Sequence, residues 1–213
     1  MIVLGLDPSL TNFGWALHDT EAEGAKRAIA KGRFQTSRKD LFIDRYTDLR
    51  SRLGLLIKEH QPDRISCEYP VFGEIYSEGM YGLFLFTCEA IRKADKDVVF
   101  FSPGQLKAHA RFFLKRPEGW DMKKPDMVEA AQKNSGGKGR WNHNEADAYW
   151  ASVAGGRFWS LFEEKIPLDS LSPVEKSQFT KIHTFKRGKK AGKTVQPGIL
   201  FREDERFFQW SKR

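Results

Sequence analysis

The first 19 residues hold two apolar segments separated by a short turn, and this pattern constrains the fold more than any other. The segments are "MIVLGLD" and "FGWALHD", and a third, more polar segment, "KRAIAKGRFQT", follows after another turn. Three successive strands joined by short turns predict an antiparallel meander. Asp7 ends the first strand, where burying an unpartnered carboxylate is costly. Either Asp7 caps the turn, or a positive group such as a metal ion lies beside it.

The apolar spacing changes to a helical period between residues 41 and 60, and Pro62 lies where a helix stop is expected. The segment "DRISCEYP" then reads as a short strand that ends in a second acid, Glu68. Because a helical crossover separates this strand from the meander, we expect it to pair in parallel with an earlier strand.

The rest of the chain continues to alternate between helices and strands as far as about residue 160. We expect helices over 74–94, 104–114 and 122–133, a strand at "DVVFFSP", and a late helix in "WNHNEADAYWASVAGGRFW". Beyond this point the periodicity weakens. We therefore expect one α/β domain over residues 1–160 and a basic C-terminal extension over residues 161–213.

The net charge of +8 is concentrated in the second half of the chain. Residues 105–140 hold 9 Lys and Arg against 4 Asp and Glu, and residues 176–193 hold 7 against none, whereas residues 1–104 are nearly neutral. This asymmetry favours a polyanionic partner over the alternative of a solvated basic surface.

No segment approaches the ~20 apolar residues of a membrane span, and no basic leader precedes the first strand. The two cysteines, Cys67 and Cys88, lie in apolar surroundings without metal-ligand spacing. Unpaired thiols of this kind are typical of a reducing compartment, so we expect an intracellular, cytoplasmic protein that does not enter a membrane.

Three acids recur at the ends of core elements: Asp7, Glu68, and Asp147 in the late helix. Taken singly, each has an ordinary alternative as a turn residue, a strand-end charge or a solvated helix residue. Together they suggest a carboxylate cluster at one sheet edge, where ligand sites of α/β proteins lie. Clustered carboxylates call for a cation, and Mg²⁺ or Mn²⁺ suits such oxygen ligands. Two such ions would support hydrolysis of a phosphodiester.

The ordered segments "LGLDPSLTNFGWAL", "RISCEYP", "FFSPGQLK" and "HNEADAYWAS" resemble the RuvC-type Holliday-junction resolvases of the ribonuclease H-like superfamily. The resemblance covers about residues 1–156. It implies a mixed five-stranded sheet flanked by helices, two Mg²⁺ or Mn²⁺ ions for each active site, and Asp7, Glu68 and Asp147 as metal ligands. The divergence and the basic extension are compatible with a viral or phage member.

One position departs from the family pattern. The family places a fourth ligand, Asp or sometimes His, three residues before the helix aspartate, and here that residue is Asn144. Asn144 offers a neutral carbonyl oxygen, a weaker ligand than a carboxylate. His143 is the other candidate, as a ligand or proton carrier. Asn142 and Glu145 fit a helix capping box, which makes Glu145 structural. Alternatively, Asn144 is an inactivating substitution.

The resemblance also suggests which residues hold DNA. Lys107, and either Lys123 or Lys124, resemble family lysines near the scissile phosphate, with Lys124 in a catalytic role. Tyr69 and Phe72 are candidates for an aromatic that wedges into the base stack, and the alternative is packing beneath the loop. The stretch "KIHTFKRGKKAGK" interleaves cations with an aromatic and is a candidate to follow a phosphate backbone.

The resemblance implies a metal-dependent endonuclease that cuts four-way DNA junctions symmetrically, leaving 5′-phosphate and 3′-hydroxyl ends. Two symmetric cuts require a homodimer, and the helix over 74–94 is the candidate interface because Tyr81, Phe84 and Phe86 exceed what one core-facing side needs. The alternative is a branched-DNA binding protein that does not cleave. An actin-like or sugar-kinase phosphate loop is disfavoured, because that fold needs a second half for which this chain is too short.

Overall fold

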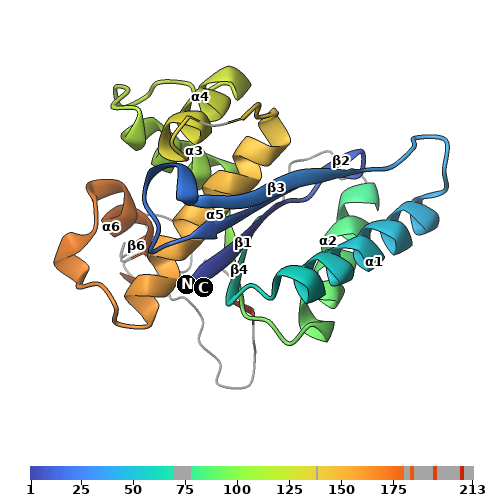
Figure 1. The fold of residues 1–213 in the computed structure, drawn as a ribbon. Helices are drawn as coiled ribbons and strands as arrows, with labels where there is room; N and C mark the ends of the chain where they lie inside the picture. Colours follow the sequence, from blue (N-terminus) through green and yellow to red (C-terminus); the bar gives the residue numbers. More distant parts are fainter. Residues whose placement is uncertain (70–77, 138, 180–182, 185–193, 196–206, 209–213) are drawn as a thin grey trace.

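The computed structural model describes residues 1–69, 78–137, 139–179, 183–184, 194–195 and 207–208. A six-stranded mixed β-sheet runs through the centre of the molecule, and helices cover both of its faces (Figure 1). The predicted α/β class is confirmed.

The sheet combines the antiparallel meander and the parallel crossover strands that the sequence predicts. Its strands are β1 (Ile2–Asp7), β2 (Asn12–Asp19), β3 (Ala28–Gln35), β4 (Arg64–Glu68) and β5 (Val98–Phe101), in the order β3-β2-β1-β4-β5. The pairs β1–β2 and β2–β3 are antiparallel, whereas β1–β4 and β4–β5 are parallel. The short β8 (Phe207–Phe208) pairs in parallel with β5, and β6 (His183–Thr184) pairs with β7 (Thr194–Val195) in a separate ribbon.

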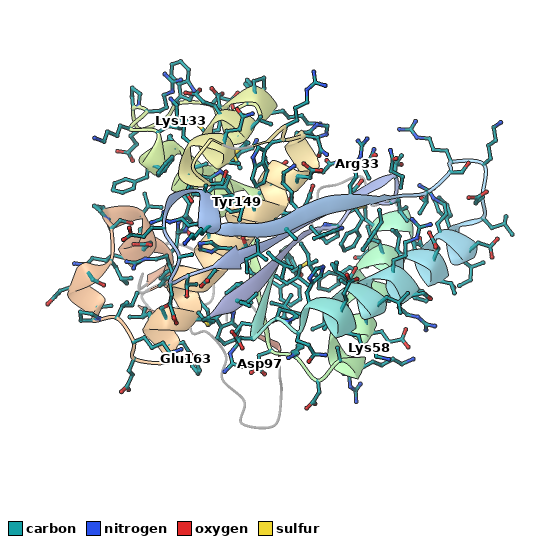
Figure 2. The ribbon with its side chains drawn as sticks, in the orientation of Figure 1. Arg33, Lys58, Asp97, Lys133, Tyr149 and Glu163 are labelled. Carbon is teal, nitrogen blue, oxygen red and sulfur yellow. The ribbon has the colours of Figure 1, made fainter. Side chains whose placement is uncertain are left out.

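The helices form two layers around this sheet. One layer contains α1 (Phe42–His60) and α2 (Glu78–Lys93); the other contains α3 (Pro103–Phe113), α4 (Lys124–Asn134), α5 (His143–Phe162) and α6 (Pro173–Phe179). Two 3₁₀ turns, η1 (Gly24–Lys26) and η2 (Leu168–Ser170), lie in the connections. Figure 2 shows Lys58 on α1 and Lys133 on α4 at the outside of these opposite layers, with Tyr149 of α5 in the interior.

The two-residue period of the strands divides the core between these layers. In β5, Val98 and Phe100 pack in the cluster under α1 and α2, whereas Val99 and Phe101 pack in the cluster under α5 and α6. Successive strand side chains point to opposite faces, so a buried central strand must be apolar at every position. This explains why "VVFF" and "IVLGL" show no alternation.

Local signals set the ends of the helices. α1 ends at His60 and is capped by Gln61, whose backbone is left-handed (φ 47°) and whose N–H bonds to the Ile57 carbonyl at 2.9 Å. Pro62 follows, where a helix cannot continue. α3 begins with a capping box in which Ser102 accepts from the Gln105 N–H and the Gln105 side chain accepts from the Ser102 N–H.

The chain beyond residue 160 also packs against the sheet layer. Phe179 of α6 joins the cluster around Phe101, and Gln178 lies 2.8 Å from Nε2 of the buried His109 on α3. Arg157 of α5 bonds to Glu175 at 2.6 Å. The described core therefore continues through α6, and the basic stretch at 181–193, apart from its two residues in β6, lies outside the described residues.

Candidate active site

The parallel pairing of β1 with β4 places two acids at the same edge of the sheet. In this register Leu6 pairs with Cys67, so that Asp7 and Glu68 are the next residues of the two adjacent strands. The carboxyl edge of parallel strands is where α/β proteins place ligand sites.

Helix α5 lies directly on the sheet because glycines face it. A Cβ atom at Gly5 would overlap the carbonyl oxygen of Ala148, and one at Gly14 would overlap the carbonyl oxygen of Asn144. Gly14 is also the residue of β2 that pairs with Asp7. The first turns of α5 are thereby held next to the strand ends, which brings Asn144 and Asp147 to the edge that carries Asp7 and Glu68.

The three acids lie within electrostatic reach of one another. Burial, then the charges of Glu68 and Asp147, raise the pKa of Asp7 well above its usual value. Burial and the Asp147 charge raise the pKa of Glu68 to about 8. The pKa of Asp147 is raised to about 6 by burial. Together the three groups form a partly buried acidic cluster whose full ionisation is unfavourable without additional positive charge.

Two lysines supply part of that charge. Lys107 on α3 opposes the rise in the pKa of Glu68 and of Asp147, and Lys124 at the start of α4 opposes it for Asp7 and Asp147. Lys123, by contrast, pairs with Asp121, and both side chains are exposed. The structure thus distinguishes the two adjacent lysines: Lys124 acts on the acidic cluster, whereas Lys123 is paired elsewhere.

The oxygen donors of the cluster are of the kind that Mg²⁺ and Mn²⁺ select. Among the described residues, no three His, Cys, Asp or Glu side chains are arranged closely enough to hold an ion as they stand. The charges of Glu68 and Asp147 nevertheless help to raise the pKa of Asp7, and that of Asp147 helps to raise the pKa of Glu68, so a cation would relieve this repulsion. The chemistry of the donor set, carboxylate oxygens beside an amide oxygen, is therefore the kind that a divalent metal uses.

The remaining candidate residues lie at the start of α5, where their surroundings differ. Asn144 is buried, with 8% of its surface exposed, beside Gly14. His143 is only partly buried, and burial followed by the charges of Lys124 and Arg33 lowers its pKa. The predicted capping box is confirmed, because the Asn142 side chain accepts from the Glu145 N–H at 3.0 Å. Glu145 also pairs with Lys31 at 2.5 Å.

Of the two aromatic candidates after β4, the structure describes Tyr69 but not Phe72. Tyr69 donates its N–H to the Phe101 carbonyl at 2.7 Å, and its ring packs edge-on against Phe84 and Phe100. These contacts favour the packing alternative for Tyr69. Phe72 lies outside the described residues.

Sequence reasoning missed two kinds of residue at this site. Gly5 and Gly14 determine how closely α5 approaches the strands, and their only signal was a glycine within an apolar strand. Arg33 on β3 acts electrostatically on His143, and an exposed strand arginine gives no sequence signal of its own.

The mixed sheet with its acidic edge defines the class: the chain has a ribonuclease H-like fold. No family model matches the sequence. The Thermus thermophilus RuvC structure superposes with a TM-score of 0.61 at 18% identity, covering 77% of this chain and 97% of that one. T. thermophilus RuvC in complex with a Holliday junction superposes with a TM-score of 0.59, also at 18% identity, covering 76% and 96%.

Curated relatives share partial sequence similarity with this chain. A crossover junction endodeoxyribonuclease RuvC from Erythrobacter litoralis is 40% identical over 68 residues, which are 32% of this chain and 40% of that protein. The RuvC of a Synechocystis species is 27% identical over 109 residues, 50% of this chain and 65% of that protein. The predicted resemblance to the RuvC-type resolvases is confirmed in sequence and in fold, and the matched regions span less than two thirds of these relatives. Within the described ranges, no helix is long and apolar enough to cross a membrane.

Proposed function

We propose that this chain is a metal-dependent endonuclease that cuts four-way DNA junctions, leaving 5′-phosphate and 3′-hydroxyl ends. The observation that carries the proposal is the acidic cluster of Asp7, Glu68 and Asp147, flanked by Lys107 and Lys124. The curated relatives are crossover junction endodeoxyribonucleases, and one solved structure of the same fold is a complex with a Holliday junction.

The acidic cluster would hold two Mg²⁺ or Mn²⁺ ions through Asp7, Glu68 and Asp147, with Asn144 as a neutral fourth ligand. Bound there, the ions supply positive charge for activating water and for stabilising the leaving oxygen. Because the pKa of Glu68 is raised to about 8, this carboxyl is largely protonated at neutral pH in the free protein. Metal binding must therefore release protons, which is measurable without any DNA.

The lysines have a separate role in the same proposal. Lys107 and Lys124 are exposed and lie beside the acidic cluster, where each presents a point charge to a phosphate. Lys124, at the first position of α4, would stabilise the charge that develops on the scissile phosphate. Contacts of this kind make DNA affinity fall steeply with salt.

The direct test compares Asp7→Asn with the unmodified chain on a synthetic four-way junction and on linear duplex. We expect Asp7→Asn to bind the junction as well as the unmodified chain and to lose Mg²⁺-dependent cleavage. Asp44→Asn, an exposed acid on α1, is the matched control and should cleave normally. Retained Mg²⁺-dependent cleavage by Asp7→Asn would refute the assignment of the acidic cluster.

Asn144 supports a second candidate function, a branched-DNA binding protein that does not cleave. A buried neutral amide next to the acidic cluster provides less negative charge for a second metal than a carboxylate does. If this is the function, the unmodified chain binds junctions without cutting them in Mg²⁺ or Mn²⁺, and Asn144→Asp gains cleavage. Cleavage by the unmodified chain in either metal excludes this candidate.

A homodimer is part of the proposal, because two symmetric cuts need two active sites. On α2, Phe84 packs against Tyr69 and Phe86 stacks on Tyr46, so both rings are used within the subunit. Tyr81 and Leu85 are instead exposed, at 44% and 64%. We therefore expect Leu85→Glu to weaken the dimer, as measured by analytical ultracentrifugation. If the unmodified chain is a monomer in the same experiment, the proposed homodimer is wrong.

A further inference from the structure

The segment between α3 and α4 carries an exposed tryptophan. Trp120 has 45% of its surface exposed, whereas Trp141, Trp150 and Trp159 are buried at 8%, 2% and 0%. A single exposed aromatic residue is unremarkable by itself. What sets Trp120 apart is how firmly the chain holds it and what lies next to it.

The backbone on both sides of Trp120 is fixed. Its N–H bonds to the Pro117 carbonyl at 3.1 Å, closing a turn in which Gly119 has a φ of 85°. Two residues later, Met122 is buried in the cluster between α4 and α5, with 2% of its surface exposed. The indole is thus presented to solvent by a segment that is anchored at each end, so binding there costs little additional ordering.

An arginine lies over the indole. The guanidinium carbon of Arg116 is 5.3 Å from the centroid of the Trp120 ring, and Arg116 is itself held by Glu129 at 3.3 Å. This cation–π contact orients the ring and leaves close to half of the side chain open. The arrangement is a stacking platform with a positive charge attached.

The platform lies beside the residues proposed to hold the scissile phosphate. Lys124, four residues after Trp120, acts electrostatically on Asp7 and Asp147. Asp121, the next residue in the chain, is bonded to Lys123 and is also within reach of the Lys107 charge. The segment that carries Trp120 therefore adjoins both lysines of the candidate active site.

We propose that Trp120 stacks on an unpaired or partly unstacked nucleobase of the DNA strand, next to the phosphate that is cut. The inference rests on the proposed nuclease function and adds a binding residue to it. Aromatic rings beside lysines and arginines are the means by which proteins hold single-stranded segments, because every base offers a flat face. The centre of a four-way junction supplies bases whose stacking is already interrupted.

The charge around Trp120 favours DNA over a protein partner as the occupant. Residues 105–140 hold 9 Lys and Arg against 4 Asp and Glu. Four exposed cations, Lys115, Arg116, Lys123 and Lys124, lie within five residues of the ring, against two exposed acids, Glu118 and Asp121. Although Arg116 and Lys123 each pair with an acid, the excess of positive charge suits a phosphate backbone beside a stacked base. A protein interface core, by contrast, is depleted in charged residues.

The test uses the Asp7→Asn chain without divalent metal, so that binding is measured without cleavage. The probe is a four-way junction with 2-aminopurine placed in turn at each position around the cut site mapped with the unmodified chain. Trp120→Ala, Trp120→Phe and Trp120→Leu are compared in this background. Phe42→Ala is the matched control, because Phe42 is 51% exposed, lies on α1 in the opposite helix layer and also has an arginine over its ring, at 5.9 Å.

Stacking on Trp120 predicts a specific pattern. Trp120→Ala weakens junction binding about tenfold and removes the fluorescence quenching at one 2-aminopurine position, since base stacking contributes an effect of that order. Trp120→Phe keeps most of the affinity and the quenching, Trp120→Leu keeps neither, and Phe42→Ala stays within about twofold of the parent. The melting temperatures should all lie near that of the parent, because neither Trp120 nor Phe42 belongs to the buried apolar clusters of the described core.

Two results would overturn the inference while leaving the nuclease function intact. One is a Trp120→Ala chain that binds and quenches like the parent, and the other is a Trp120→Leu chain that equals Trp120→Phe, which would indicate apolar packing instead of stacking. Failure of the unmodified chain to cleave a junction in Mg²⁺ or Mn²⁺ is a different result, and it refutes the proposed function itself.

Discussion

Gly14→Ala is a demanding test of how α5 is seated, because it adds only one methyl group. The new Cβ would lie 2.6 Å from the carbonyl carbon of Asn144 and 3.0 Å from its Cβ, besides overlapping its carbonyl oxygen. Ordinary contact distances are 3.4–4 Å. Because the colliding atoms are mainly backbone, no side-chain rotation relieves the overlap, and helix and strand must separate by roughly 1 Å.

Gly14→Ala should reduce the cleavage rate much more than it reduces the stability of the fold. Overpacking of this kind costs about 1–3 kcal/mol, which lowers the melting temperature of a domain of this size by about 5 °C. The same displacement moves Asn144 and Asp147 away from Asp7, and a misplacement of ~1 Å reduces a rate by about 100-fold. Cleavage should therefore fall much more than the small loss of folded protein explains.

The assay measures urea unfolding and junction cleavage for Gly14→Ala beside Gly54→Ala. Gly54 is inside α1, where a Cβ would meet nothing within 4 Å, so alanine there should stabilise the protein by about 0.5–1 kcal/mol. The same chemical change thus has opposite signs at the two positions. If Gly14→Ala matches the unmodified chain in both assays, α5 does not lie against β2 as described.

Two further expectations concern single charges. Lys124→Ala should slow cleavage by about 100-fold in a single-turnover assay, whereas Lys123→Ala should change the rate less than about threefold. Equal effects of the two substitutions would contradict the different surroundings of the two lysines. Burial lowers the pKa of His18 to about 4. Below pH 6.5 the unfolded chain therefore binds a proton that folding must remove, which lowers the free energy of unfolding, and this loss grows as the pH falls toward 4. At pH 5 the neutral His18 lowers the free energy of unfolding by about 2 kcal/mol. His18→Gln should remove this part of the pH dependence of stability, measured by urea titrations at several pH values. If the pH dependence is unchanged, His18 is protonated freely in the folded protein.

The strands and helices of the nuclease-like part were predictable because their signals are local. The shift from apolar runs to a helical period at residue 41 gave a helix within one residue of α1 (Phe42–His60). The capping pair at Asn142 and Glu145 marked the start of α5 correctly. The antiparallel meander and the parallel pairing of the crossover strand with an earlier strand were also predicted, whereas the full strand order came from the structure.

The parts that sequence reasoning missed depend on long-range contacts. The seven-residue α6 has little periodicity, and it is held by Gln178 on His109 and by Phe179 beside Phe101, pairs separated by about 70 residues or more. Lys123 and Lys124 are adjacent in sequence, and only the folded chain shows that their charges act in different places. For the candidate site, the three acids could be predicted from the sequence. The role of Gly5 and Gly14 in letting α5 lie close to the strands is visible only in the packing.

The three acids of the cluster come from distant parts of the chain, and this has a consequence during protein synthesis. Asp7 and Glu68 leave the ribosome well before Asp147, whose helix must still be translated and laid across the strands. A nascent chain that has formed only the strands and α1 therefore lacks the third carboxylate. If the proposed nuclease function holds, DNA cleavage would become available only after α5 has docked on the strands.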